Sequence, residues 1–312
     1  SQGWPRVASF SDDSFVVVYQ DNHRDGDTLG VMATLFDFSA TRLGEQLVNV
    51  DWTGSQMTPD VAVLTDESYV VAFRDTENEV WTRRFRRDGV KWTGRIERSA
   101  DDPSGLDQRA PSAAATPTGE VLVAWQGPSV LGGDDDIVAR LFDADGIATS
   151  EAMNLSGDDT VVQAHPSVAA HDGGFVVVWD ERDGRNSPST QALRLDRDGE
   201  VVQGPFAVQA SPYPVQRRSH VSARPDGSFV VVWVAHRKGN PYGEARAYNS
   251  AGEKIGAGGV IMSPHRAGYQ GSVRAAAHPA KNEFLVAYDF AYSGASLYVG
   301  RFNHEPRQLV GP

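Results

Sequence analysis

Six short apolar runs recur along the chain at nearly constant intervals, and each run ends in an aromatic residue. The clearest run is Phe175–Trp179, of sequence FVVVW. The closing aromatics are 54, 52, 54, 54 and 55 residues apart and are Tyr19, Phe73, Trp125, Trp179, Trp233 and Tyr288. Periods of this size are typical of solenoids, propellers and repeat arrays. The apolar residues are consecutive instead of alternating, which predicts strands that are buried on both faces.

Each run is the second of four short strands that the repeat predicts. A first segment that opens on Gln-x-x-Pro or a variant precedes the run, and a third segment after it closes on an aromatic residue or leucine. Turn dipeptides separate the segments, such as Asp172-Gly173 before the run and Asp198-Gly199 after the third segment. Four strands in a repeat of about 53 residues are typical of a β-propeller blade.

We therefore expect an all-β chain that forms a single six-bladed β-propeller with four antiparallel strands per blade. A linear β-solenoid is the alternative, but solenoids have shorter periods and need end caps that this sequence does not show. The first repeat starts near the beginning of the chain, so we expect the ring to close without a swapped strand. The six repeats cover approximately residues 1–55, 56–107, 108–162, 163–215, 216–269 and 270–312.

Composition and charge narrow the classes of partner. The chain is 40% hydrophobic and 22% charged, and no apolar run reaches the roughly 18 residues that a membrane span needs. A net charge of −12 disfavours nucleic acid and anionic membranes as partners. The chain contains no cysteine, which excludes disulfides and thiolate zinc sites and suits export from a bacterium. We expect a secreted or surface-exposed bacterial protein without membrane insertion, which could be one part of a longer protein.

Three motifs recur with the repeat: Pro-x-Val-Ala, the FVVVW run, and Ala-Arg-Leu-Phe-Asp-x-Asp-Gly. Together they resemble the propeller-forming repeats of large secreted and surface proteins of bacteria, and the resemblance covers the whole chain. It implies a propeller fold, and it implies adhesion and sugar binding among the functions of its members. The fold alone does not settle the function. The Ser-x-Asp-x-Gly-x-Thr-Trp turn motif of six-bladed sialidases is absent, which counts against that family.

The loops between second and third strands differ from repeat to repeat, and they share one face with the loops that enter each first strand. Variable loops on a repetitive frame are typical of a ligand-facing surface. Arginine forks on this face match carboxylate oxygens, so an acidic glycan is the natural ligand if they converge; salt bridges to neighbouring acids are the alternative. The candidate ligand-binding residues are Arg74, Asp180, Arg182, Arg217, Arg218, His220, His236, Arg237, His265, Arg266, Tyr269 and Asp289.

Two further sets of polar residues indicate specific roles, one in metal binding and one in structure. Asp21, Asp25 and Asp27 place hard oxygen donors in one loop, which could bind Ca²⁺, although their spacing is not that of an EF-hand and solvated loop acids are the alternative. A glutamine also recurs once per repeat at the entry to the first strand. Its amide can tie the backbone of one blade to the next, so we expect a structural role for Gln2, Gln56, Gln108, Gln163, Gln216 and Gln270.

These features favour an extracellular, non-enzymatic propeller that binds a glycan or another extracellular ligand on its loop-rich face. One alternative is an enzyme that acts on an acidic polysaccharide. It would be a hydrolase that uses Asp180 or Asp289 with a second carboxylate, or a lyase that uses Tyr269 with His220, His236 or His265. Another alternative is a protein-interaction scaffold in a larger surface protein. No catalytic residue can be assigned, because the sequence contains no zinc-protease helix motif, phosphate loop, dinucleotide fingerprint or nucleophile elbow. Calcium is the only cofactor that the sequence suggests.

Overall fold

The computed structural model describes the greater part of the chain as strands and turns. The described residues are 2–22, 24, 26, 28–49, 53–87, 97–98, 108–128, 135–157, 161–182, 189–208, 217–237, 240–256, 260–261, 272–281, 283–291, 295–303 and 308–310. Only the backbone is described for 97–98, 217, 236–237, 240–241, 260–261, 289–291, 295–298 and 308–310. The chain divides into two compact units, Ser1–Asp158 and Asp159–Pro312. The single ring expected from the repeats stays a prediction.

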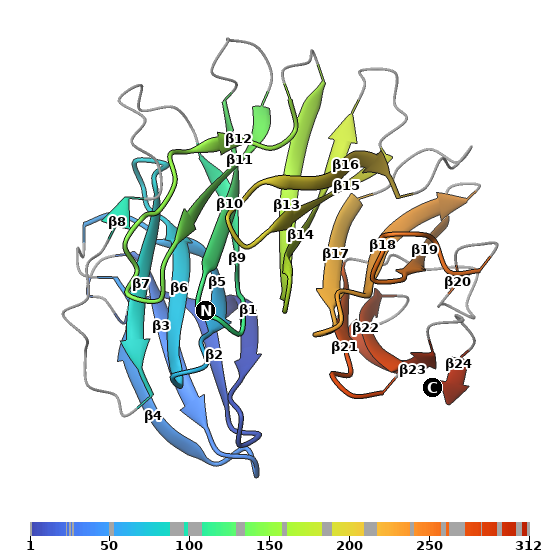
Figure 1. The fold of residues 1–312 in the computed structure, drawn as a ribbon. Helices are drawn as coiled ribbons and strands as arrows, with labels where there is room; N and C mark the ends of the chain where they lie inside the picture. The colour runs from blue at the N-terminus through green and yellow to red at the C-terminus, as the bar shows by residue number, and fades with distance from the viewer. Residues whose placement is uncertain are drawn as a thin grey trace. The chain divides into compact units, whose positions relative to one another are not determined.

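The unit Ser1–Asp158 contains three antiparallel sheets, each with its four strands in sequence order (Figure 1). The first sheet comprises β1 (Gln2–Ser9), β2 (Phe15–Asn22), β3 (Leu29–Phe36) and β4 (Arg42–Leu47). The second comprises β5 (Met57–Val63), β6 (Ser68–Arg74), β7 (Val80–Arg86) and β8 (Glu97–Arg98). The third comprises β9 (Arg109–Ala115), β10 (Val121–Pro128), β11 (Asp135–Phe142) and β12 (Met153–Asn154).

The unit Asp159–Pro312 contains three further antiparallel sheets, again with four strands each in sequence order. The fourth sheet comprises β13 (Val162–His171), β14 (Gly174–Arg182), β15 (Ser189–Asp196) and β16 (Val201–Ala207). The fifth comprises β17 (Arg217–Ala223), β18 (Phe229–Arg237), β19 (Asn240–Tyr248) and β20 (Val260–Ile261). The sixth comprises β21 (Val273–Ala277), β22 (Glu283–Ala291), β23 (Ala295–Asn303) and β24 (Gln308–Val310). The all-β class and the four antiparallel strands per repeat are thus confirmed. Among the described residues, no helix is long and apolar enough to cross a bilayer.

The turns between first and second strands follow the predicted hairpin chemistry. In the fifth sheet the Arg224 N–H donates to the Ser228 carbonyl, and the Gly227 N–H donates to the Arg224 carbonyl. Gly227 has a φ of 83°, the left-handed conformation that this type of hairpin places at its third residue. The Asp226 carboxylate accepts hydrogen bonds from the backbone N–H and the hydroxyl of Ser228. Local hydrogen bonds therefore close this hairpin, and the Asp172 N–H of the fourth sheet also donates to its Pro225 carbonyl at 3.1 Å.

The apolar runs form the second strands, and four of them are buried along their whole length as predicted. They are Tyr69–Phe73, Val121–Trp125, Phe175–Trp179 and Phe229–Trp233. The runs in β2 and β22 differ, because their burial alternates. Val16 and Val18 are fully buried, whereas Val17 between them is only half-buried, and Leu285 is 48% exposed beside the fully buried Val286. Within the unit Ser1–Asp158, the second sheet has a packed neighbour on each face and the first sheet has one on a single face.

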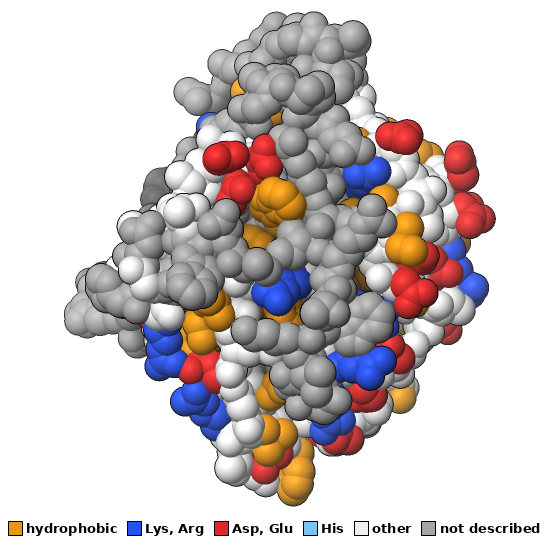
Figure 2. All heavy atoms as spheres, turned by 90° about the vertical axis from the view of Figure 1, so that its left-hand side faces the viewer, with side chains coloured by type: hydrophobic (Ala, Val, Ile, Leu, Met, Phe, Trp, Pro, Cys, Tyr) orange, Lys and Arg blue, Asp and Glu red, His pale blue; other side chains and the backbone are white. Residues whose placement is uncertain are grey.

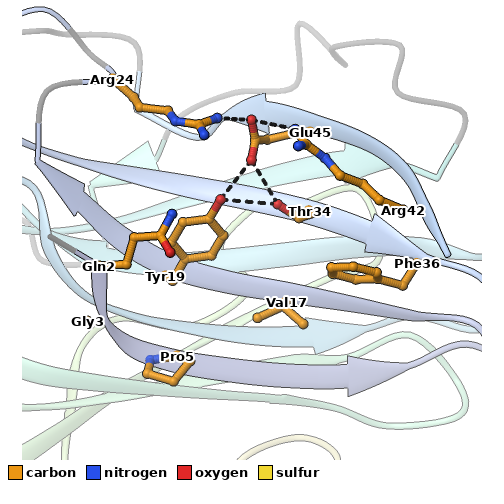
Figure 3. Close-up of a pocket in the computed structure, with 10 residues that line it drawn as sticks. All are labelled: Gln2, Gly3, Pro5, Val17, Tyr19, Arg24, Thr34, Phe36, Arg42 and Glu45. Atoms are coloured by element: carbon orange, nitrogen blue, oxygen red, sulfur yellow. Dashed lines mark hydrogen bonds and ion pairs between the residues drawn. The ribbon is translucent and has the colours of Figure 1, made fainter. Parts of the chain in front are cut away.

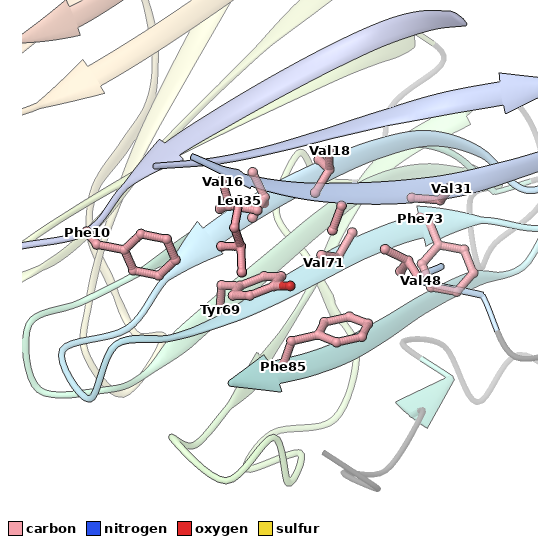
Figure 4. Packing of buried hydrophobic residues seen from close by; sticks show 12 residues of the cluster. Phe10, Val16, Val18, Val31, Leu35, Val48, Tyr69, Val71, Phe73 and Phe85 are labelled. Carbon is pink, nitrogen blue, oxygen red and sulfur yellow. The ribbon is translucent and has the colours of Figure 1, made fainter. Parts of the chain in front are cut away.

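Neighbouring sheets within a unit interdigitate their apolar side chains. Figure 4 shows this packing between the first and second sheets, where Val16, Val18 and Leu35 meet Tyr69 and Phe85. The ring of Tyr69 stacks on that of Phe85, with centroids 5.2 Å apart. Corresponding clusters lie between the second and third sheets, the fourth and fifth, and the fifth and sixth. Apolar burial of this kind is the main force that stabilises such a stack of sheets.

Hydrogen bonds from side chains to backbone also join successive sheets. The Asp60 carboxylate accepts from the Ala113 N–H at 3.0 Å, and the Ser222 hydroxyl accepts from the Ala277 N–H at 2.8 Å. Gln108 behaves as predicted for the repeated glutamines, because its side-chain carbonyl accepts from the Val80 N–H of the second sheet at 3.0 Å. Gln2 instead donates to Asp21 within its own sheet, Gln56 donates to the Thr53 carbonyl, and Gln163 is buried. Gln216 and Gln270 lie outside the described residues.

Arginines of the second sheet add charged links at the turns. The buried Arg84 guanidinium pairs with Asp66 and donates to the Ser68 hydroxyl in its own sheet, and it also reaches Asp145 of the third sheet at 3.4 Å. Arg87 pairs with Asp12 of the first sheet and with Glu67 of its own. Both arginines therefore fix the second sheet relative to a neighbour.

Candidate functional site

The starts of the first strands and the ends of the second strands lie at the same end of each sheet. Antiparallel pairing requires this, and the register shows it in Gln2 opposite Asp21, Met57 opposite Arg74, and Arg217 opposite Val234. Most of the candidate residues that the structure describes belong to this end of their sheets. Arg74 lies in the unit Ser1–Asp158, whereas the other described candidates of the ligand set lie in Asp159–Pro312.

A β-bulge marks this end in five repeats, and the sequence analysis did not predict it. The register of the first strand shifts by one residue in each of the first five sheets. At the bulge a non-glycine residue adopts a left-handed conformation, with φ between 49° and 58°; these residues are Trp4, Thr58, Ala110, His165 and Arg218. Such a conformation costs of order 1 kcal/mol and persists where surrounding contacts fix it. Bulges commonly redirect a side chain next to a functional site.

Asp180 supplies the contacts that fix the bulge of the fifth sheet. One carboxylate oxygen of this fully buried residue accepts from the Arg218 N–H at 2.7 Å. The other accepts from the backbone N–H and the hydroxyl of Ser219, at 3.2 and 2.9 Å. His165 Nδ1 lies 3.3 Å from Asp180 Oδ2. Asp180 therefore positions its neighbours across two sheets, which is a different role from the direct ligand contact expected of it; that contact stays a prediction.

Three exposed residues lie close to this buried carboxylate in space or along the chain: His165 contacts it through Nδ1, Arg218 donates its backbone N–H to it, and Arg182 follows it by two residues in β14. The His165 side chain is 48% exposed, and Arg218 and the strand-end residue Arg182 are also exposed. We call the group His165, Asp180, Arg182, Arg218 and Ser219 the His165 corner; it lies where β13, β14 and β17 meet (Figure 1). Sequence reasoning missed His165, although the position two residues after the repeated glutamine differs in every repeat and could have indicated it.

The remaining candidates lie apart from this corner or outside the described side chains. His220 is half-buried, and its Nδ1 accepts from the Ala275 N–H at 3.4 Å, a contact between the fifth and sixth sheets. Burial lowers the pKa of Arg74, whose guanidinium lies 3.8 Å from the Met57 sulfur. The structure gives only the backbone of Arg217, His236, Arg237 and Asp289, in β17, β18 and β22. His265, Arg266 and Tyr269 lie outside the described residues.

Of the three aspartates proposed to bind Ca²⁺, the structure describes only Asp21. The Asp21 carboxylate is buried, accepts a hydrogen bond from the Gln2 side chain at 2.9 Å, and has Arg24 Nε at 3.8 Å. A guanidinium at this distance competes with a metal ion for the same oxygens. Asp25 and Asp27 lie outside the described residues, and the part of the chain that is described contains no group of three acidic or histidine side chains arranged for a metal. Calcium binding by this loop stays a prediction.

A pocket of about 440 Å³ opens on the half-buried face of the first sheet (Figure 3). Val17, Tyr19 and Phe36 form its apolar part, and Gln2, Arg24, Thr34, Arg42 and Glu45 form its polar part. Glu45 is the hub of the polar part. It accepts from the Tyr19 hydroxyl at 2.7 Å and pairs with Arg24 and with Arg42, the latter at 2.6 Å.

The surroundings of Tyr19 and Glu45 keep both groups in their ordinary charge states at neutral pH. Burial raises the pKa of the Tyr19 phenol, which therefore stays protonated at neutral pH. Burial alone would raise the pKa of Glu45, but the hydrogen bond from Tyr19 and the charges of Arg24 and Arg42 outweigh it and hold that pKa below its usual value. Glu45 is therefore ionised, and its two oxygens are engaged by Tyr19, Thr34, Arg24 and Arg42. This arrangement is suited to holding Arg24 and Arg42 in place and unsuited to proton transfer.

Figure 2 shows one face of the molecule, with acidic and basic side chains interspersed among hydrophobic ones. No broad basic field covers the described part of this face, which agrees with a net charge of −12. Electrostatic recognition on such a surface has to come from a local group of like charges.

Comparison with known proteins identifies the fold. No protein-family model and no curated protein matches the sequence. Solved structures do match. A protein of unknown function from Dyadobacter fermentans has a TM-score of 0.66 at 14% identity, over 96% of this chain and 93% of that one. An α-L-arabinanase from Penicillium chrysogenum, complexed with arabinobiose, has a TM-score of 0.64 at 11% identity, over 97% and 94%.

The β-propeller domain of the Trilobed protease from Pyrococcus furiosus also matches, with a TM-score of 0.55 at 10% identity, over 100% of this chain and 85% of that one. At these identities the likeness shows the fold alone. The chain has an all-β, β-propeller fold.

Proposed function

We propose that this protein is a six-bladed β-propeller, with one repeat per blade, that binds carbohydrate at the loop-rich end where the His165 corner lies. We further propose that it acts outside a bacterial cell, alone or as one part of a larger surface protein of the repeat class that its motifs resemble. Six sheets of four antiparallel strands support the blade number. The likeness to an arabinanase that binds arabinobiose supports a carbohydrate ligand.

The exposed side chains of the His165 corner carry the proposal. Asp180 is buried and holds the backbone of Arg218 by a hydrogen bond of 2.7 Å, so the corner is fixed before any ligand arrives. Sugar sites use a few well-placed polar groups on a rigid frame, because each hydroxyl needs a partner in a defined direction. An exposed imidazole and two exposed guanidinium groups provide such partners.

The test is binding to a broad array of neutral and acidic glycans, with calcium and again with a chelator, while the supernatant is assayed for released sugar. We expect retention of intact glycan, and we expect His165→Ala to weaken it about tenfold, as the loss of one good hydrogen bond does. Lys281→Ala is the control, because Lys281 is exposed in a turn at the other end of its sheet.

The other outcomes separate the alternatives. Release of sugar would show that the protein is a hydrolase or lyase and not a binding module. Loss of binding with the chelator would add calcium. If the protein retains no glycan, the proposal is overturned, and a protein-interaction scaffold is the remaining alternative.

A further inference from the structure

We propose that His171 makes the contact between the fourth and fifth sheets sensitive to pH. The contact is closed while the imidazole is neutral, and it opens when the ring takes up a proton in acid. It lies at the turns between first and second strands and is independent of the glycan binding proposed above. The proposal stands on the place of the ring, the hydrogen bond that it accepts and the charged groups around it.

The ring of His171 lies where two turns meet. His171 ends β13 and is buried, and its ring lies against Gly173 of its own turn and Gly227 of the turn between β17 and β18. A Cβ atom on Gly227 would come within 3.3 Å of His171 Nδ1, so the approach is close. The Asp172 N–H also donates to the Pro225 carbonyl at 3.1 Å, which joins the two turns through their backbones. A displacement of the ring therefore acts on the contact between the two sheets.

The hydrogen bond at Nδ1 selects the neutral form of the ring. His171 Nδ1 accepts from the Gly173 N–H at 3.0 Å, so the neutral ring has its proton on Nε2. Nε2 is buried and finds no hydrogen-bond partner among the described residues. Protonation would place an N–H on Nδ1 as well, and this donor would face the N–H of Gly173. The ring can therefore take up a proton only if the Gly173 bond breaks and the ring leaves its place.

The charges near the ring also favour the neutral form. They come from its own turn, from β15 and the turn after it, and from the turn of the fifth sheet, and they are Asp172, Arg194, Arg197, Arg224 and Asp226. Burial lowers the pKa of His171 below its usual 6.5, and the charge of Arg194 acts in the same direction. Asp172 and Asp226 act in the opposite direction and are outweighed.

The lowered pKa gives the sign of the pH effect. The closed contact binds this proton less well than the opened chain does, so its stability is complete above about pH 6.5 and falls as the pH drops below that value. One proton is taken up on opening, so the ratio of opened to closed contact should rise by at most about tenfold per pH unit. Acid therefore favours separation of the two turns.

Other repeats supply a variant and a control. Phe10 and Leu64 directly follow the residue that pairs with the start of the apolar run, as His171 does, and both are buried. An apolar side chain thus fits this position, and we expect His171→Leu to fold. His278 has the same position in the sixth sheet, and its Nδ1 accepts from the Lys281 N–H at 3.0 Å, but it is only half-buried. His278→Leu is therefore the matched control.

The experiment is hydrogen exchange of the full chain, followed by mass spectrometry and corrected for the effect of pH on the intrinsic rate. Peptides that cover residues 168–176 and 221–230 report on the two turns. We expect their protection to fall at least about threefold between about pH 7.5 and about pH 5, while peptides of the first and second sheets keep theirs. His171→Leu should abolish the fall, and His278→Leu should leave it in place.

Several outcomes would overturn the proposal. One is protection of the two turns that does not change in acid, and another is a fall that persists in His171→Leu. An equal fall in the first and second sheets would also overturn it, because the whole chain would then be unfolding. If His171→Leu does not fold, His171→Gln replaces it with the same expectation, since an amide does not titrate. An imidazole ¹⁵N spectrum at neutral pH should place the proton of His171 on Nε2, and a proton on Nδ1 would contradict the hydrogen bond on which the proposal rests.

Discussion

The first and second sheets are built from the same repeat, yet their central strands differ in burial. In β6 every residue from Tyr69 to Phe73 is buried, whereas in the corresponding run of β2, Phe15–Tyr19, only Val16 and Val18 are. Val71 and Val17 occupy the same position of the repeat, and so do Phe85 and Phe36. The difference teaches that the repeat sequence encodes a strand with two apolar faces, and that a neighbouring sheet on each side is needed to bury both.

The largest expected effect concerns the aromatic that closes the third strand. Phe85 is fully buried, so Phe85→Ala should lower the free energy of unfolding by about 3–5 kcal/mol. In a ring of six blades every sheet has two neighbours, so the propeller proposal expects Phe36→Ala to approach that loss. Urea denaturation of the two variants beside the parent chain measures both.

A loss below about 1.5 kcal/mol for Phe36→Ala would mean that the face of the first sheet is open in solution, and would contradict a closed ring.

Cysteine labelling makes the same comparison without removing an aromatic ring. The label reacts only at the introduced residue, because the chain contains no cysteine of its own. Val17→Cys and Val71→Cys should both react slowly with a maleimide. Val7→Cys is the fast control, since Val7 is 65% exposed.

The loss of a charged side chain should separate the first and second sheets by a smaller difference in unfolding free energy. Arg84 is buried and joins Asp66, Ser68 and Asp145, so Arg84→Ala should cost about 2–3 kcal/mol through the polar groups that it leaves without a partner. Arg42 pairs with Glu45 but is half-exposed, and Arg42→Ala should cost no more than about 1 kcal/mol. Thermal and urea unfolding measure both. Equal losses would contradict the view that burial on two faces distinguishes the second sheet.

The smallest expected difference between the first and second sheets concerns the loss of stability at alkaline pH. Burial raises the pKa of Tyr69 to about 12, above the usual 10, so the folded chain keeps a proton that the unfolded chain releases. Stability should therefore fall as pH rises from about 10 to about 12, and Tyr69→Phe should flatten this fall. Burial also raises the pKa of Tyr19, and Tyr19→Phe should flatten it less. Unfolding followed across this pH range decides, with the tyrosinate absorbance as a second readout.

Much of the fold could be predicted because each sheet is encoded locally. The run Phe175–Trp179 predicted β14, and the turn dipeptide Asp198-Gly199 predicted the junction between β15 and β16. Gln108 was assigned a structural role because one residue type recurred at one place in every repeat, and its bond to Val80 bears this out. Period, turn chemistry and apolar runs all act over short distances along the chain.

The His165 corner was harder to predict because its contacts join residues far apart in sequence. Asp180 and Arg218 are separated by 38 residues, and nothing in the local sequence indicates that the carboxylate accepts from that N–H. Asp180 was therefore assigned to the ligand and not to the frame. The bulge was missed for the same reason, since the left-handed residues Thr58 and Arg218 each depend on an acceptor from the preceding sheet, Gln20 and Asp180.

In the part of the chain that the structure describes, each sheet takes its four strands from one continuous stretch of sequence, and none of these strands comes from a distant segment. A nascent chain can therefore complete one sheet before the next has been synthesised, and the loops to be closed within a sheet are short. Repeats of this kind can be duplicated, lost or exchanged as whole genetic units, since no unit lends a strand to another. A residue such as His165 can then change in one copy while the other copies keep the architecture intact.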